Sequence, residues 1–204
     1  MNIDNTLSRS KLVISFSEKD EEEIFYPHHD ALVLELRMSV HSITRILIDN
    51  GSSADVLFYS TFLAMGYDPK KLLPCYTPTQ LTGFSGNPVF PIGYVTIPVI
   101  FGKAPCSVFT IVDFLVVDIP SAYNGIIGRK TLHHIGGVPS SYHLKLKFPT
   151  DNGVGVEYGS QSVAQQCYNL SAKPVDISKT PVNRKKLALP LSHLLQNIKK
   201  KEFK

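Results

Sequence analysis

Short stretches in which apolar and polar residues alternate run along most of the chain, and this pattern is typical of half-buried β-strands. Residues 31–38 and 42–49 form two such stretches around a short turn, so a hairpin is expected there. The pattern returns over 76–117, and 142–158 predicts another hairpin. The chain is therefore expected to be an all-β, or mainly β, protein.

Two segments favour short helices instead. Apolar residues recur at helical spacing within 53–66, where Ser53 could cap the N-terminus of a helix and Gly66 could end it. Asp55 would lie in the first turn, where the helix dipole favours an acid, so a structural role is expected for it. The second predicted helix covers 128–135.

Three predicted strands carry more specific expectations. Residues 11–16 alternate weakly and are expected to form a strand. Pro98 interrupts the strand predicted at 94–101 and indicates an edge position, because proline cannot donate to a strand ladder. The nearly continuous apolar run 109–117 is consistent with a buried strand.

The composition fits one packed domain with tails. The 204 residues are 43% hydrophobic and 19% charged, which makes a packed core feasible. We expect a flexible N-terminus at 1–10, a folded domain at 11–173 and a basic linker or tail at 174–204. Much of the net charge of +4 lies in that tail. Because blocks of like charge are usually solvated, nucleic-acid binding is unexpected.

Membrane, disulfide and metal signals are missing from the sequence. No apolar run is long enough to cross a membrane, and the first residues lack an apolar signal core. Cys75, Cys106 and Cys167 are odd in number and far apart, which disfavours a disulfide framework and a zinc site. The adjacent His28 and His29 have no third ligand at useful spacing. These features predict a soluble intracellular protein, cytoplasmic or nuclear, without a metal.

The clearest candidate for chemistry is Asp49-Asn50-Gly51-Ser52, which directly follows an apolar run. Glycine permits close approaches that other residues do not, and main-chain amides with a serine hydroxyl can hold a carboxylate. A strand that delivers an aspartate into such a turn is how aspartic proteases present a catalytic carboxylate. The same residue types also form ordinary surface turns. The second Asp-Asn-Gly, at 151–153, has no buried strand before it and is expected to be such a turn.

Two later segments favour the protease interpretation. Glycines within 81–86 would permit a mobile hairpin lid, although an ordinary glycine-rich loop has the same composition. Residues 126–128 read Ile-Ile-Gly and stand directly before the second predicted helix. An Asp-x-Gly turn that is followed by a glycine hairpin and then by Ile-Ile-Gly is much more specific than any one of these pieces.

As a set, these motifs make the chain resemble the protease region of plant gypsy-type LTR retrotransposon polyproteins, in the retropepsin superfamily. The match extends over about 11–173 and is carried by 26–33, 46–58, 81–86, 118–129, 142–150 and 161–168. The resemblance implies a retropepsin-like acid protease barrel with one or two short helices. It also implies a homodimeric site to which each chain gives one aspartate, with no metal and no organic cofactor.

The resemblance also implies roles for individual residues. The ionised Asp49 of one chain would act as general base on a water, while the protonated Asp49 of the other would donate to the scissile carbonyl oxygen. Asn50 and Gly51 would complete the loop, and Ser52 or Ser53 would orient the carboxylate. The flap over an extended peptide or polyprotein substrate would be Gly83, Phe84, Ser85 and Gly86, and the segment packed behind the loop would be Ile126, Ile127 and Gly128.

Asn50 departs from the family's usual Thr or Ser, whose hydroxyl bonds to the opposite loop and locks the dimer. Two hypotheses therefore stay open. The chain is either a homodimeric aspartic endopeptidase that cuts its own polyprotein, or a catalytically inactive module of the same fold that dimerises or binds extended peptides. No polymerase signature is present, so a fragment, a truncated copy or a domesticated remnant is expected.

Overall fold

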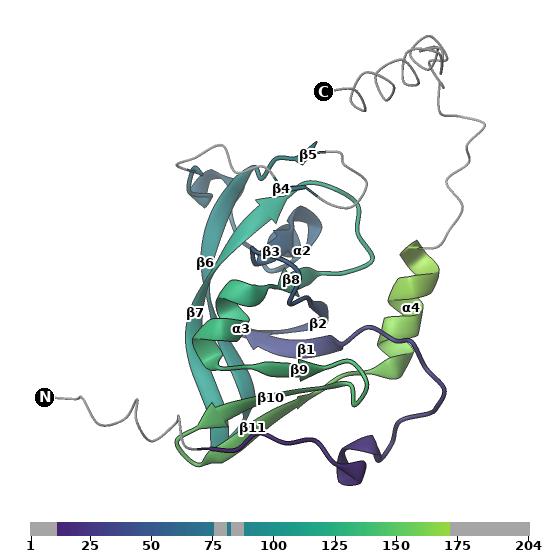
Figure 1. Cartoon of the computed structure of the whole chain (residues 1–204). Helices are drawn as coiled ribbons and strands as arrows, with labels where there is room; N and C mark the ends of the chain where they lie inside the picture. The colour runs from purple at the N-terminus through teal and green to yellow at the C-terminus, as the bar shows by residue number, and fades with distance from the viewer. Residues whose placement is uncertain (1–11, 76–80, 83–87, 172–204) are drawn as a thin grey trace, which may run out of the picture. The chain divides into compact units, whose positions relative to one another are not determined.

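The computed structural model describes residues 12–75, 81–82 and 88–171, and they form the mainly β fold that the sequence predicts (Figure 1). Six strands close a barrel in the order β1-β2-β8-β3-β7-β6. These are β1 (Val33–Met38), β2 (His41–Ile48), β3 (Val56–Phe58), β6 (Gly93–Lys103), β7 (Cys106–Val117) and β8 (Gly125–Ile127). A second sheet, in the order β11-β10-β9, contains β9 (Val138–Ser140), β10 (Lys145–Thr150) and β11 (Gly153–Tyr158). The short strands β4 (Leu81–Thr82) and β5 (Pro88–Val89) pair with each other.

Helices are short and few in the described part of the chain. They are α2 (Tyr59–Ala64), α3 (Arg129–Ile135) and α4 (Gln161–Ser171), with 3₁₀ turns η1 (Glu18–Glu21) and η2 (Pro69–Lys71). The sequence did not predict α4. This helix begins after Ser160, whose main-chain carbonyl accepts a hydrogen bond from the N–H of Ala164 at 2.9 Å. None of these helices is long and apolar enough to cross a bilayer.

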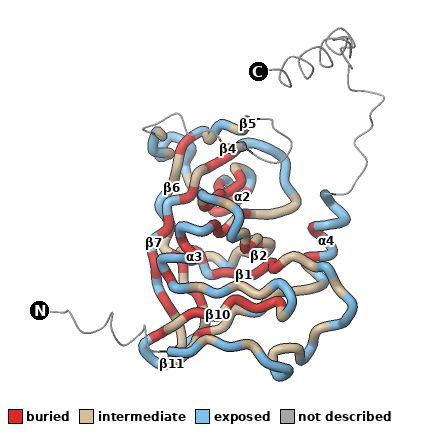
Figure 2. The backbone as a smooth tube through the Cα atoms, viewed as in Figure 1, coloured by how far each residue is buried: buried red, intermediate tan, exposed pale blue. Residues whose placement is uncertain are grey.

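The β6–β7 hairpin is the longest in the barrel and carries much of its core. Ile97, Val99 and Phe101 of β6 are completely buried, as the two-residue period of a strand requires. The core continues into the second sheet, where the rings of Phe101 and Phe148 meet edge to face with centroids 6.1 Å apart. Buried residues accordingly run through the barrel and along β10 (Figure 2).

Strand β8 enters the barrel between two strands that lie much earlier in the chain. It is parallel to β2, with Ile126 opposite Leu47, and antiparallel to β3, with Ile126 opposite Val56. Gly125 makes this close approach possible, because a Cβ there would lie 3.0 Å from the carbonyl oxygen of Val56. The loop 49–55 joins β2 to β3 and therefore passes the end of β8.

The helix predicted over 53–66 is shorter than expected. It begins at Tyr59, because the three residues before it form strand β3. That strand pairs with β7 on one side and β8 on the other, and these tertiary pairings outweigh the local helical period. Ser53 consequently does not cap the helix. Gly66, at φ 77°, follows its C-terminus as predicted.

Three strand predictions were wrong in part. Residues 12–16 form no strand. Strand β6 is not an edge, because it pairs with β7 along its length and with β1 at Val99 and Ile100; Pro98 lies just before that second pairing. Strand β7 is buried on one face up to Asp113, since Phe109 and Ile111 are each 63% exposed, and it is buried on both faces at its end, where Val116 and Val117 are at most 1% exposed.

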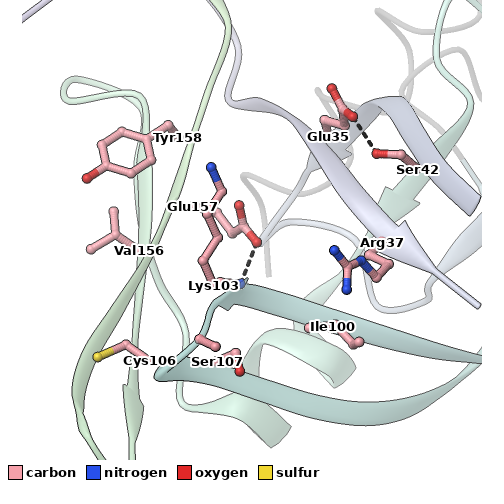
Figure 3. Close-up of a pocket in the computed structure, with 12 residues that line it drawn as sticks. Glu35, Arg37, Ser42, Ile100, Lys103, Cys106, Ser107, Val156, Glu157 and Tyr158 are labelled. Atoms are coloured by element: carbon pink, nitrogen blue, oxygen red, sulfur yellow. Dashed lines mark hydrogen bonds between the residues drawn. The ribbon is translucent and has the colours of Figure 1, made fainter.

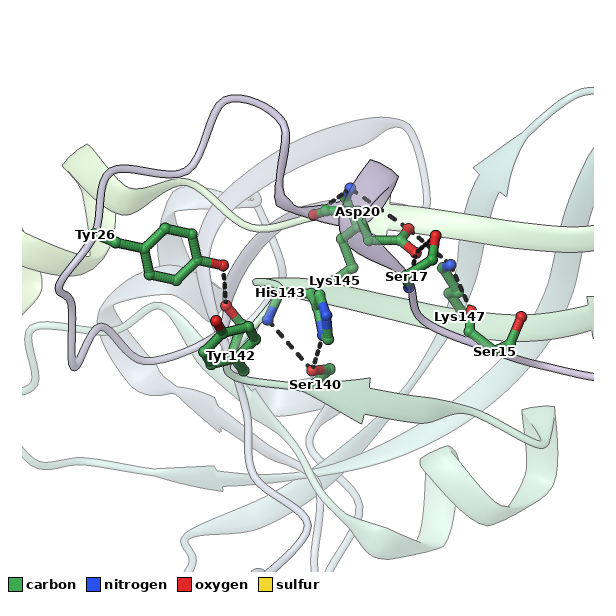
Figure 4. A network of polar contacts seen from close by, with 9 residues as sticks. All are labelled: Ser15, Ser17, Asp20, Tyr26, Ser140, Tyr142, His143, Lys145 and Lys147. Atoms are coloured by element: carbon green, nitrogen blue, oxygen red, sulfur yellow. Dashed lines mark hydrogen bonds and ion pairs between the residues drawn. The ribbon is translucent and has the colours of Figure 1, made fainter.

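Residues 12–30, here called the N-terminal strap, are tied to strand β10 by two lysines (Figure 4). Lys147 Nζ lies 2.7 Å from Oδ1 of Asp20 and donates to the carbonyl of Ser15 at 2.7 Å. Lys145 Nζ donates to the main-chain carbonyl of Asp20 at 2.7 Å. The hydrogen bond from Lys147 lowers the pKa of the Asp20 carboxyl to about 2.

The other end of the N-terminal strap is tied to α4 and to the turn before β10. The hydroxyl of Tyr26 donates to the carbonyl of Tyr142 at 3.2 Å (Figure 4). The Gln161 side chain accepts from the N–H of Phe25 at 2.9 Å and donates to its carbonyl at 3.1 Å. The first and last parts of the described chain therefore hold each other in place.

We expect Asp20→Asn to weaken this attachment in a pH-dependent way. Because the pKa of Asp20 falls from 3.8 to about 2 on folding, its stabilising contribution is complete above 3.8 and is lost as the pH falls through about 2. The variant should be less stable than the parent at pH 7, by roughly 1 kcal/mol or less for a partly exposed network, and the difference should shrink on acidification. Urea unfolding at several pH values measures this. The exposed Asp118→Asn should show no such change, and a deficit that is constant with pH would contradict the assignment.

Candidate active site

Asp49 opens the loop 49–55 and is fixed by the main chain on both sides. Its N–H donates to the carbonyl of Ile127 in β8 at 3.0 Å, and its carbonyl accepts from the N–H of Ser52 at 3.1 Å. The N–H of Gly51 donates to Oδ1 of its carboxylate at 2.9 Å. The loop thus fixes the backbone and one carboxylate oxygen of Asp49.

The second oxygen of this carboxylate, Oδ2, is available for chemistry. It makes no hydrogen bond or ion pair with any residue in the described ranges, and the side chain of Asp49 is half-buried. A carboxylate that is fixed through one oxygen and open at the other can accept a proton from water or share one with a second acid. The geometry is therefore suited to general acid–base catalysis.

Asn50 and Gly51 form the exposed tip of the loop. A Cβ at Gly51 would lie 3.0 Å from Oδ1 of Asp49, so a larger residue would press on the carboxylate that the Gly51 amide holds. The side chain of Asn50 bonds to no residue in the described ranges. It is accessible to another molecule.

Ser52 stabilises the loop instead of the carboxylate. Its hydroxyl donates to the carbonyl of Ala54 at 2.8 Å and accepts from the N–H of Ala54 at 3.3 Å. Its carbonyl accepts from the N–H of Arg129 at 2.9 Å. The expected bond from Ser52 to the Asp49 carboxylate is absent, because the hydroxyl is used to close the loop.

The structure brings Ile126, Ile127 and Gly128 against the loop. Ile127 is completely buried, and its carbonyl accepts the bond from Asp49 described above. A Cβ at Gly128 would lie 2.3 Å from the carbonyl oxygen of Ala54. No side chain fits at position 128 unless the loop moves.

Asp55 is a buried acid that joins the loop to the end of β8 and to α3. It is 2% exposed, and Oδ1 accepts from the N–H of Gly128 at 2.7 Å while Oδ2 accepts from the hydroxyl of Thr131 at 2.8 Å. Burial raises the pKa of this carboxyl, although both hydrogen bonds favour its charged form. Asp55 therefore has a structural role, as expected, but through these bonds at the start of α3 and not through the first turn of the helix predicted over 53–66.

Asn124 has a role that the sequence analysis missed. Its side-chain amide donates to the carbonyl of Thr44 at 2.8 Å, and its oxygen accepts from Arg45 Nη2 at 3.0 Å and from the hydroxyl of Thr61 at 3.2 Å. Arg45, at φ 57°, lies where the β1–β2 register shifts. Asn124 thus holds the entry to β8 against β2 and α2. The available signal was a polar residue directly before an apolar strand.

The four residues of the predicted flap lie outside the described residues: Gly83, Phe84, Ser85 and Gly86. The strands β4 and β5 that flank them are described. Leu81 and Val89 of these strands pack against a small apolar cluster formed by Val56, Phe58 and Val117. Two of those three residues belong to β3, the strand into which the Asp49 loop leads.

No group of three or more His, Cys, Asp or Glu that could hold a metal occurs in the part of the chain that the structure describes. His28 belongs to the attachments of the N-terminal strap, with Nε2 3.0 Å from the carbonyl oxygen of Tyr142 and Nδ1 3.8 Å from Oδ2 of Asp30. His133 and His134 lie in the last turn of α3, as the sequence predicts.

Neither a protein-family model nor a curated protein matches the chain. Among solved structures, the retroviral protease-like domain of Ddi1 from Leishmania major matches over 63% of this chain and 95% of its own, at 16% identity and a TM-score of 0.45. The EIAV protease complexed with the inhibitor HBY-793 matches over 57% and 99%, at 21% identity and 0.40. A retropepsin-like aspartic protease from Rickettsia conorii matches over 63% and 83%, at 16% identity and 0.38. These neighbours are retropepsin-like aspartic proteases.

We expect Thr131→Val to destabilise the protein, because it leaves one oxygen of the buried Asp55 without its donor. The loss in free energy of unfolding at pH 7 should be about 1–3 kcal/mol. The pKa of Asp55 is raised in the folded protein, so the buried carboxyl is protonated at low pH and charged at higher pH. The hydroxyl of Thr131 stabilises the charged form, so the loss in free energy of unfolding should be smaller at low pH than at pH 7. Chemical denaturation at both pH values measures this.

Thr96→Val is the matched control for this prediction. It removes a hydroxyl bond of 2.7 Å to the carboxylate of Asp113 at an exposed site, so its cost should be much smaller. Equal losses in the two variants would show that burial of Asp55 does not matter.

Proposed function

We propose that the chain is an aspartic endopeptidase in which Asp49 activates a water molecule to attack a peptide bond. The observation that carries this proposal is the state of its carboxylate, with Oδ1 held by Gly51 and Oδ2 open within the described residues. Behind it, Asp55 and Gly128 fix the loop. A carboxylate that keeps its position can transfer protons without a reorganisation cost.

The proposed reaction needs a second carboxylate, because one acid must be ionised and the other protonated. Asp55, the other acid of the loop, is buried and bonded to Gly128 and Thr131, so it is not free for this task. We assign the second role to Asp49 of another copy, brought to the first across a two-fold axis. The two groups would share one proton and titrate as a pair.

The proposed substrate is an extended polypeptide, such as the polyprotein of a plant gypsy-type retrotransposon, to which the motifs of the chain are similar. The exposed tip at Asn50 and Gly51 leaves room for both a substrate and a partner loop. The segment 83–86 would close over the substrate as the flap. No metal or organic cofactor is required, because the carboxylate pair carries both proton transfers.

Asn50 supports a second candidate function, an inactive module that dimerises or holds extended peptides without cutting them. Its amide stands at the exposed tip of the loop, where the resemblance implies a hydroxyl that locks two chains together. An amide is longer and differently shaped, so it can leave the two carboxylates misaligned. Peptide binding without turnover would distinguish this module from an enzyme.

Asp49→Asn should abolish cleavage of an unbiased peptide library at acidic pH, with a rate loss of at least about a hundredfold, because the amide is neither acid nor base. Mass spectrometry of the products of the purified full chain measures this, and circular dichroism checks that the fold is retained. Asp118→Asn should keep the parent rate. Pepstatin-type transition-state mimics should inhibit cleavage by the parent chain. Cleavage that persists in Asp49→Asn would reject the mechanism.

Asn50→Thr separates the two candidate functions. A hydroxyl that bonds across the two loops should lower the dimer dissociation constant by about tenfold, the scale of one net hydrogen bond. Sedimentation measures the dimer, and the cleavage rate per dimer measures competence. If the Asn50→Thr variant cleaves peptides and the parent does not, the parent chain is an inactive module. If both cleave peptides at the same rate per dimer, the parent chain is an enzyme. Ser53→Thr, at an exposed neighbouring position, is the control and should change neither quantity.

A further inference from the structure

A pocket of about 770 Å³ lies between β1, β11 and the β6–β7 hairpin. Figure 3 shows Glu35 and Arg37 of β1 on one side, and Val156 and Tyr158 of β11 on the other. The hairpin provides the floor, which includes Ile100. No residue of the loop 49–55 or of 126–128 lines this pocket, so it is separate from the candidate active site. We call it the edge groove.

The edge groove exists because two strands begin side by side and then diverge. The N–H of Ser160, just after β11, donates to the carbonyl of Val33 at the start of β1 at 3.0 Å. Beyond this bond β11 is the last strand of its sheet, and β1 pairs with β6 at its final two residues, Arg37 and Met38. The strand segments in between have no pairing partner on the sides that face each other.

The main-chain groups of these segments point into the edge groove. The N–H of Gly159 donates to Leu144 on the β10 side, whereas that of Ser160 points to β1. Because successive residues of a strand alternate direction, the amides and carbonyls of Val156 and Tyr158 face the same way as that of Ser160. The main-chain carbonyl of Val33 points toward β11, where it accepts from Ser160. By the same alternation, the main-chain groups of Glu35 point from β1 into the edge groove. Two unpaired strand edges thus border one groove.

The charges in the edge groove are unequally compensated. Glu35 accepts a bond from the hydroxyl of Ser42, and Glu157 accepts one from the N–H of Gly102. Arg37 makes no ion pair or side-chain hydrogen bond with any residue in the described ranges. Lys103 lies close enough to favour the charged form of Glu157 but forms no ion pair with it. The unsatisfied groups at this site are therefore cationic donors.

We infer that the edge groove binds an extended segment of another polypeptide that carries an acidic side chain. The segment adds as a strand, and its main chain bonds to the free edges of β1 and β11. Its carboxylate is held by the Arg37 guanidinium, which can donate two parallel bonds, with Lys103 nearby. This site does not use Asp49, so it is independent of the proposed protease function.

The test uses the full chain carrying Asp49→Asn, so that no peptide is cut. The probe is an acetylated, amidated heptapeptide of alternating threonine and valine with a central glutamate, and its counterpart has glutamine at that position. Titration followed by NMR should shift the amides of Glu35, Arg37, Val156 and Tyr158. The glutamate peptide should bind about tenfold more tightly than the glutamine peptide, the scale of a charge-assisted hydrogen bond.

Arg37→Gln should remove that preference, so that both peptides bind the variant equally. Lys70→Gln, at an exposed cation of η2, is the matched control and should keep it. Equal binding of the two peptides to the parent, an unchanged preference in Arg37→Gln, or the largest shifts on residues 49–55 would each overturn the inference. So would sedimentation showing that a second copy of the chain occupies the edge groove and excludes the peptide.

Discussion

The buried carboxylate of Asp55 holds together the parts of the chain on which the candidate active site depends. Its two oxygens bond to Gly128 and Thr131, which lie 73 and 76 residues later in the sequence. A buried carboxylate without such partners is costly, so the loop 49–55, the end of β8 and the start of α3 are stable in this arrangement together. The position of Asp49 follows from it, because the N–H of Asp49 bonds to the residue directly before Gly128.

The β architecture could be predicted where the local pattern and the final environment agree. The stretches 31–38 and 42–49 alternate because one face of each strand meets the barrel core, and they became β1 and β2. The hairpin of β10 and β11 followed from its turn residues and the alternation on either side. The meeting of the Asp49 loop with 126–128 was implied by the resemblance, since single-sequence patterns do not report long-range pairing.

What could not be predicted depends on neighbours that are distant in sequence. Strand β3 was hidden within a helical period, because its two partner strands come much later in the chain. The hydroxyl of Ser52 could serve either the carboxylate or the loop, and the loop position that decides this depends on Arg129. The sequence analysis assigned no role to Asn124, because the three elements that its amide joins are far apart in the chain. The edge groove exists because β1 and β11 diverge after a single bond, which no local pattern records.

The N-terminal strap has a consequence for how the molecule assembles during synthesis. Its attachments to Lys147 and Gln161 span 132 and 136 residues, so the strap leaves the ribosome long before its partners exist. The barrel can close earlier, once β8 has emerged, because its six strands end at Ile127. The strap is therefore made before its partners and is among the last of the described segments to dock. Until then the acidic turn η1 stays in solvent, with its future lysine partners not yet translated.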